Sequence, residues 1–277
     1  MKQSWFAGAA LTCVLAGSAM AADMPLKAPV APVPRVISDW TGFYIGIHGG
    51  YGWARPNISD FDLNQSNPAI VTAAANDEHF SLHAPKLRGT VFGGHAGYNW
   101  QWGQRGVAGF EIDYSVSNIQ RTQGAFADLG YPFFTSNTRT LQSKLDSLAS
   151  ARARVGFLVG PEFLLYGTGG AAWGHTKVTD SYVQHRLGYG DDVFASRASA
   201  DHFGWVAGAG TEWKLWNSGL MLRVEYLHYG FGSASLAFDT NHTGAVSGVQ
   251  NKKGASFNMP LDRLTTDVVR GGVSYKF

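Results

Sequence analysis

The chain has 277 residues, a formal net charge of +2 and a single cysteine. This length predicts one domain, or one domain with a tail, and the small net charge argues against a nucleic-acid partner, which would need a basic surface. Charged residues make up 15% and aromatic residues 13% of the chain, which is too apolar for a disordered protein, and one cysteine excludes a disulfide scaffold and a four-thiolate zinc site.

Residues 1–21 have the features of a secretory signal peptide. Lys2 supplies the positive charge, residues 5–16 supply the apolar segment, and Ala19 and Ala21 are the small residues of a cleavage site. The cysteine lies inside this segment, so the exported chain is expected to contain none, which suits an oxidising compartment.

Residues 22–39 are predicted to form a proline-rich periplasmic tether. Pro25, Pro29, Pro32 and Pro34 recur at the short intervals typical of an extended linker. We favour a plain linker; the alternative is a spacer that reaches a periplasmic partner. The remaining residues, 40–277, are predicted to form an outer-membrane β-barrel domain, for the following reasons.

From Trp40 onward, apolar residues alternate with small or polar residues in eight segments: 40–53, 89–102, 106–117, 145–157, 163–175, 202–216, 220–231 and 264–277. A period of two predicts β-strands, and each segment is longer than the roughly 9–11 residues that a tilted strand needs to cross a bilayer. Short turns alternate with long connections near residues 54–88, 118–144, 176–201 and 232–263. The fold class predicted is therefore all-β: an eight-stranded antiparallel transmembrane β-barrel with short periplasmic turns and four long extracellular loops.

One face of these segments is apolar, and the other carries most of the charge. We predict that the charged face points inward and forms an ion-pair network of Glu111, Asp113, Arg152, Arg154, Glu212, Lys214, Arg223, Glu225, Arg270 and Lys276. An eight-stranded barrel is just wide enough for side chains to fill it. The network is therefore expected to fill the lumen, with a polar path for ions or small solutes as the alternative.

A soluble sandwich would turn the two faces the other way, and alternation alone does not separate the two folds. The signal peptide favours the membrane barrel, as do aromatic residues at the strand ends, which are typical of the membrane interface. The predicted interfacial aromatics are Trp40, Tyr51, Trp53, Trp100, Trp102, Trp213 and Trp216.

The sequence offers little support for catalysis. His48 and His95 are predicted to point inward on neighbouring strands, but no serine or carboxylate can be placed beside either one from sequence alone. We therefore predict no catalytic residue, no metal site and no cofactor. A lipid-modifying outer-membrane enzyme remains a third hypothesis, after a structural protein and a narrow porin.

Several stretches together resemble a known family: Ala22–Pro25, Trp40–Gly46, Gly94–Gln101, Ala151–Gly156, Leu164–Gly170, Val224–Leu227 and Arg270–Phe277. The chain resembles the alphaproteobacterial small outer-membrane proteins called outer-membrane immunogenic proteins or porin-family β-barrel proteins. The resemblance implies a barrel in the cell outer membrane whose loops face outside. It also implies an aromatic C-terminal strand that the barrel-assembly machinery reads, here Tyr275 and Phe277 with Val273 on the same face.

The expected function is a structural, surface-facing role in the Gram-negative cell envelope. Outer-membrane lipid and lipopolysaccharide are the expected partners of the outward surface, and the oligomeric state is left open.

Overall fold

The computed structural model describes residues 39–57, 86–127, 134–186, 188, 190–215, 218–244, 257–261 and 263–277. The chain divides into two units, Met1–Val36 and Ile37–Phe277, and every described residue belongs to the second. The predicted signal peptide, its cleavage residues Ala19 and Ala21, and nearly all of the tether lie outside the described residues, so these boundaries stay predictions.

The described residues form ten strands. They are β1 (Gly42–Asn57), β2 (Leu87–Trp102), β3 (Gly106–Ala127), β4 (Phe134–Leu158), β5 (Phe163–Arg186), β6 (Gly190–Lys214), β7 (Leu220–Phe231), β8 (Ala234–Gly244), β9 (Phe257–Leu261) and β10 (Arg263–Lys276). No helix in this part of the chain is long and apolar enough to cross a membrane. The eight predicted segments correspond to β1–β7 and β10.

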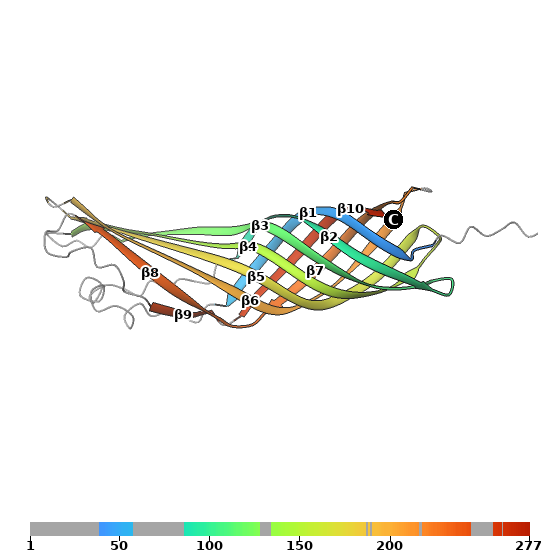
Figure 1. Cartoon of the computed structure of the whole chain (residues 1–277). Coiled ribbons are helices and arrows are strands. Elements are labelled where there is room, and N and C mark those ends of the chain that lie inside the picture. Colours follow the sequence, from blue (N-terminus) through green and yellow to red (C-terminus); the bar gives the residue numbers. More distant parts are fainter. Residues whose placement is uncertain are drawn as a thin grey trace, which may run out of the picture. The chain divides into compact units, whose positions relative to one another are not determined.

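These eight strands close into a ring (Figure 1). Strands β1 to β7 pair with their neighbours in antiparallel order, β7 pairs with β10, and β10 pairs with β1. Closure matters because a barrel without edges leaves no unpaired backbone groups to face lipid. The predicted eight-stranded antiparallel barrel is confirmed.

The two faces of the ring follow the predicted alternation. On β7, exposed and buried residues alternate from Leu220 to Leu227, and apart from glycine and alanine most outward residues of the ring are large and apolar, with Thr90 of β2 among the exceptions. Phe43 is 65% exposed, Ile112 54% and Phe203 73%. A soluble protein would bury such side chains; here they form the belt that the sequence predicts to face lipid.

The prediction of long loops is wrong at residues 118–144 and 176–201, which are mostly strand. The β3–β4 pairing runs on to Ala127↔Asn137, and β5 and β6 pair as far as Arg186↔Gly190. Part of 232–263 is also strand, because β8 pairs with β6 and β9 pairs with β8. The alternation continues here with short polar residues such as Thr140 and Ser181 in place of aromatics, so a search for apolar alternation missed it.

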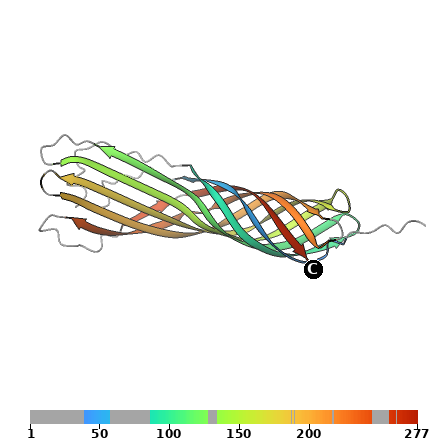
Figure 2. The ribbon, with the colours of Figure 1, turned by 90° about the horizontal axis from the view of Figure 1, so that it is seen from above.

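Figures 1 and 2 show β3, β4, β5, β6 and β8 running far beyond the ends of the other ring strands. We call this part the extension, and the opposite end of the ring, where the short connections and Phe277 lie, the turn end. The extension has a small core of its own, made of Leu141, Val178, Ala198, Ala200 and Leu236.

The interior of the ring is layered. A turn-end apolar layer contains Trp40, Tyr44, Val107, Leu158, Leu164, Tyr166 and Met221. A second apolar layer, next to the extension, contains Ala54, Leu87, Val91, Ile119, Leu145, Leu148, Ala172, Val206, Leu227, Tyr229, Phe231, Leu264 and Val268. Charged side chains occupy the space between these two layers.

Candidate functional site: a buried ion-pair network

Eight charged side chains from five strands meet in the middle of the ring. They are Glu111 and Asp113 of β3, Arg152 and Arg154 of β4, Glu212 of β6, Arg223 and Glu225 of β7, and Arg270 of β10. Each side chain is at most 2% exposed. Four guanidinium groups face four carboxylates, so the formal charges of the network cancel.

Glu111 lies at the centre of the network. Its Oε1 accepts hydrogen bonds from Arg152 Nη2 at 2.6 Å and from Arg223 Nη1 at 3.1 Å. Its Oε2 accepts from Arg223 Nη2 at 2.6 Å and from Tyr44 Oη at 2.8 Å. Arg223 therefore holds Glu111 with two parallel bonds, the geometry that makes an arginine–carboxylate pair strong and directional. The same Nη2 also donates to Glu212 at 2.7 Å.

Arg270 connects the remaining carboxylates across the lumen. Its Nε donates to Glu225 at 2.8 Å and its Nη1 donates to Asp113 at 2.8 Å. Arg152 Nη1 donates to Glu225 at 2.9 Å, and Ser150 donates to Asp113. Since every charge has a partner of opposite sign, removal of any one member would leave an uncompensated buried charge, at a cost of about 3–5 kcal/mol.

Two tyrosines join this network to the turn-end layer. Arg154 donates to Tyr44 Oη at 2.9 Å and lies over the ring of Tyr166 at 4.1 Å, and Tyr166 Oη donates to Glu225 at 3.1 Å. Gly97 of β2 makes room for Tyr44, because a Cβ atom at Gly97 would overlap the phenol group and lie 2.6 Å from the Phe110 carbonyl oxygen. Sequence reasoning missed both tyrosines, although both lie on the inward face.

A chain of neutral polar groups extends from the network along β1 and β2. Arg270 Nη1 lies 3.1 Å from His48 Nε2, the Nδ1 atoms of His48 and His95 are 3.1 Å apart, and His95 Nε2 lies 2.8 Å from Ser274 Oγ. Because a guanidinium only donates, Nε2 of His48 accepts, which in a neutral ring leaves the proton on Nδ1. His48 then donates to His95, and His95 donates to Ser274.

Ser115 also contacts His48 Nε2, at 2.8 Å. This pair differs from a nucleophile and its base, because the other nitrogen of His48 faces an imidazole where a catalytic serine–histidine pair has an orienting carboxylate. His48 and His95 are buried in the wall of the filled lumen. The arrangement orders hydrogen bonds within the wall.

Two predicted members of the network lie elsewhere. Lys214 and Lys276 are at the turn end, beyond the apolar layer. Lys214 donates to the Asp39 carbonyl at 2.6 Å and lies 5.0 Å from the ring centre of Trp40. Their prediction was wrong because an inward position at the last residues of a strand faces the open end of a barrel.

These lysines act on Asp39, which precedes β1. Burial alone would raise the pKa of this carboxyl group, but hydrogen bonds from Thr41 and the charges of Lys276 and Lys214 hold the pKa below its ordinary value. The backbone N–H of Thr41 donates to Asp39 Oδ1 at 2.8 Å. Lys214 and Lys276 thus act on Asp39 at the turn end.

Trp40 was predicted as an interfacial aromatic, and this is wrong. It is 0% exposed, its backbone N–H donates to Gln101 Oε1 at 2.8 Å, and its indole N–H donates to the Pro161 carbonyl at 3.2 Å. Trp40 precedes β1, so strand alternation does not fix its direction, and the side chain turns in to cover the turn-end layer.

The other predicted aromatics lie on the outward surface where the structure describes them. Tyr51, Trp100, Trp102 and Trp213 are 47–52% exposed, and Trp53 is half-buried. Trp216 lies outside the described residues. At the C-terminus, Val273, Tyr275 and Phe277 all face outward, with the rings of the last two packed edge to face at 5.3 Å.

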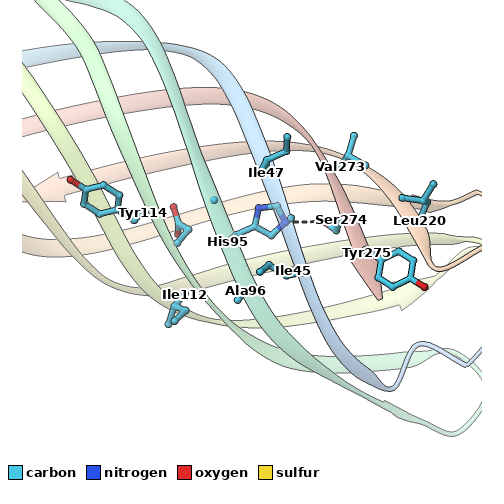
Figure 3. Close-up of a pocket in the computed structure, with 13 residues that line it drawn as sticks. Ile45, Ile47, His95, Ala96, Ile112, Tyr114, Leu220, Val273, Ser274 and Tyr275 are labelled. Carbon is cyan, nitrogen blue, oxygen red and sulfur yellow. Dashed lines mark hydrogen bonds between the residues drawn. The ribbon is translucent and has the colours of Figure 1, made fainter. Parts of the chain in front are cut away.

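The outward wall beside the histidines carries a shallow apolar groove of about 700 Å³. Figure 3 shows Ile45, Ile47, Ile112, Tyr114, Val273 and Tyr275 around it, and the His95–Ser274 hydrogen bond in the same part of the wall. Gly94 and Ala96 lie between the larger residues and leave the hollow. The groove belongs to the outward apolar belt, and its lining also includes His95, Ser274 and Asp113, the last a member of the network.

A family model and named relatives agree with this architecture. A family model described as outer membrane protein beta-barrel domain matches residues 9–277. The chain is 30% identical over 276 residues to the 31 kDa outer-membrane immunogenic protein of Brucella melitensis biotype 1, covering 97% of this chain and 98% of that relative. It is 30% identical over 214 residues to the 22 kDa outer membrane protein of Rhizobium leguminosarum bv. viciae, covering 77% and 73%. Among solved structures, the attachment invasion locus protein Ail of Yersinia pestis aligns with a TM-score of 0.35 at 13% identity, covering 86% of this chain and 99% of that chain.

Proposed function

This chain belongs to the family of outer membrane protein beta-barrel domains, and on that premise we propose that it is a sealed barrel with a structural role in the cell envelope. It is a surface-exposed protein of the cell outer membrane, like its named relatives. The short turns lie on the periplasmic side and the extension lies outside.

One observation carries the proposal: the neutral ion-pair network fills the lumen between two apolar layers. An ion that crossed would have to displace Trp40 and Tyr166 at one end and Tyr229 and Phe231 at the other. Between these layers it would have to separate guanidinium–carboxylate pairs that are 2.6–2.9 Å apart. Each separation leaves buried charges unpaired, which is strongly unfavourable.

Single-channel recording in planar lipid bilayers tests this proposal. The folded chain is expected to give no reproducible conductance steps, because the ion-pair network and the two apolar layers fill the lumen in the described part of the chain. Heat-modifiable mobility on gels from the same preparation verifies that the protein is folded. An absence of conductance steps then cannot be attributed to unfolded chains. Steps of constant size at fixed voltage would overturn the proposal in favour of a narrow porin.

We assign no catalytic residue. The Ser115–His48 contact supports this view because it is buried within the wall and lacks an orienting carboxylate. A Ser115→Ala variant is expected to fold and to leave the lipid composition of reconstituted vesicles unchanged relative to the parent chain. Deacylated lipid that forms with the parent and not with this variant would instead favour the enzyme hypothesis.

We also propose that the barrel-assembly machinery recognises the C-terminal strand through Val273, Tyr275 and Phe277. Their outward, exposed side chains at the end of the last strand support this role. Truncation of Phe277 is expected to lower the amount of folded protein in outer membranes, while refolding in detergent changes little. Equal membrane levels of the truncated and parent chains would contradict the assignment.

A further inference from the structure

The outward surface just beyond the apolar belt carries a cluster of cations on three adjacent strands. We call it the basic rim patch: Arg55 of β1, Lys86 and Arg88 at the start of β2, and Arg263 of β10. All four are exposed. Arg88 lies four residues beyond the exposed Phe92, and Arg263 lies six residues beyond the exposed Val269. The patch therefore begins where the lipid-facing surface ends.

The strand register brings these side chains together. Ala54 pairs with Leu87, which puts Arg55 beside Lys86. Arg55 pairs with Thr265 on its other side, two positions from Arg263. Outward residues related in this way on adjacent strands lie about 5–8 Å apart, so the positive charges form one continuous surface.

A hollow of about 350 Å³ opens within this patch. Tyr51, Trp53 and Ala54 of β1 line it together with Arg55, Lys86 and Arg88, and Arg88 lies directly opposite Trp53 in the strand register. A lining of two aromatic and three cationic side chains matches a molecule that has both an apolar part and an anionic part.

Among the described residues, the charge of the patch is less balanced than the charge elsewhere on this rim. On the opposite side of the ring, Asp146 pairs with Lys144 at 3.0 Å and with Lys177 at 2.8 Å. The carboxylate near the patch is Asp267, which feels the charge of Arg55 but accepts hydrogen bonds from Tyr226 at 2.7 Å and His228 at 2.6 Å. Within the described part of the chain, Lys86, Arg88 and Arg263 form no ion pair.

We propose that the basic rim patch binds the phosphate groups of a phosphorylated glycolipid of the outer leaflet, the chemistry of lipopolysaccharide. A membrane lipid fits better than a soluble anion because the patch faces away from the lumen and adjoins the apolar belt, so the acyl chains of the same molecule contact that belt. This inference rests on the proposed surface-facing role and deepens it by naming the lipid and its site.

Lipid binding by the full chain, folded in a phosphate-free zwitterionic detergent, tests the proposal. The probes are lipopolysaccharide, the same lipid after enzymatic dephosphorylation, and inorganic phosphate as a competitor. The variant is the triple change Arg55→Gln, Arg88→Gln and Arg263→Gln, and the matched control is Lys177→Gln, a rim cation with a carboxylate partner. The three substituted positions and the control position are exposed. All variants are therefore expected to fold, and the heat-dependent gel shift measures this.

We expect the triple variant to bind lipopolysaccharide at least tenfold more weakly than the parent, and Lys177→Gln to stay within about twofold. Dephosphorylation is expected to weaken binding to the parent as much as the triple change does, and millimolar phosphate is expected not to compete. Equal affinity of the triple variant and the parent would overturn the site, and competition by phosphate would identify a free-anion site instead. Conductance is recorded separately, so a channel would refute the sealed barrel without changing this result.

Discussion

The barrel and its extension are built from the same strands, yet their polarity is reversed. In the barrel, β5 presents Leu165 outward and Tyr166 to the charged lumen. In the extension, the same strand presents Lys177 outward and buries Val178. The alternation keeps its parity along the strand, and only the chemistry of each face changes. The outer medium therefore decides which face is apolar: lipid surrounds the barrel, and water surrounds the extension.

The two regions also use ion pairs differently. The barrel buries four arginines with four carboxylates as its main filling. The extension has Arg139–Asp180 at 2.7 Å, whose side chains are 8% and 15% exposed, beside its apolar core. Partial access to water lowers both the desolvation cost and the strength of that pair. Four predictions test this contrast, in order of decreasing effect on the barrel.

Arg223→Ala should have the largest effect. It leaves Glu111 without the arginine that binds both of its carboxylate oxygens and Glu212 without its closest partner, so the free energy of unfolding in detergent should fall by about 3–5 kcal/mol. Urea titration followed by tryptophan fluorescence measures this change. Arg139→Ala makes the same substitution in the extension and should lower the free energy of unfolding by about 1 kcal/mol. Similar losses for the two variants would contradict the contrast between the regions.

Gly97→Ala should destabilise the barrel by about 1–3 kcal/mol, because the new methyl group overlaps Tyr44 and the backbone of Phe110. Gly94→Ala on the same strand is the matched control: its methyl group points outward and has the Gly46 carbonyl oxygen at 3.5 Å as its near neighbour. Heat-modifiability midpoints compare the two. A loss as large for Gly94→Ala would show that strand glycine itself, and not the fit around Tyr44, is responsible.

Leu236→Ala should loosen the extension while the barrel stays intact. Leu236 is a buried member of the extension core, so protease cleavage within residues 134–144 or 190–200 should accelerate. The unfolding free energy of the barrel should change by less than about 0.5 kcal/mol, since distant sites are nearly independent. A large shift in the unfolding midpoint would instead mean that the two cores fold as one cooperative unit.

Asp39→Asn should have the smallest effect, and one that depends on pH. Because the folded-state pKa of Asp39 lies below its ordinary value of 3.8, the charged carboxyl stabilises the folded state fully above that value. The contribution is lost as pH falls through the folded-state pKa. The difference in unfolding free energy between parent and variant should therefore vanish at low pH, and a difference that stays constant with pH would argue against the assignment.

Much of the barrel could be predicted from sequence because period-two alternation is a local signal. It placed β1–β7 and β10 and separated outward from inward faces. It could not show which inward charges meet, because Glu111 contacts Arg223 through the combined register of several strands. It also could not separate the polar layer from the apolar layers, so Tyr44 and Tyr166 were missed.

The errors lie where a local rule stops applying. Trp40 lies before the first strand, and Lys214 and Lys276 lie at strand ends, where inward direction and burial are no longer linked. The strands of the extension were not predicted because their outward residues are Thr, Ser, Gln and Lys, which are typical of loops. Continued period-two alternation of Leu141, Ser143 and Leu145 against polar neighbours was the signal that could have revealed it.

The seam between β1 and β10 has a kinetic consequence. Tyr44 pairs with Lys276, and the N–H of Phe277 donates to the Phe43 carbonyl at 3.0 Å, so the ring closes between the first and the last of its eight strands in chain order. Arg270, which connects Glu225 with Asp113, arrives on that last strand. Pairing between such distant segments is intrinsically slow. A nascent chain consequently carries uncompensated carboxylates and two open sheet edges until β10 has been synthesised and has paired with β1 and β7.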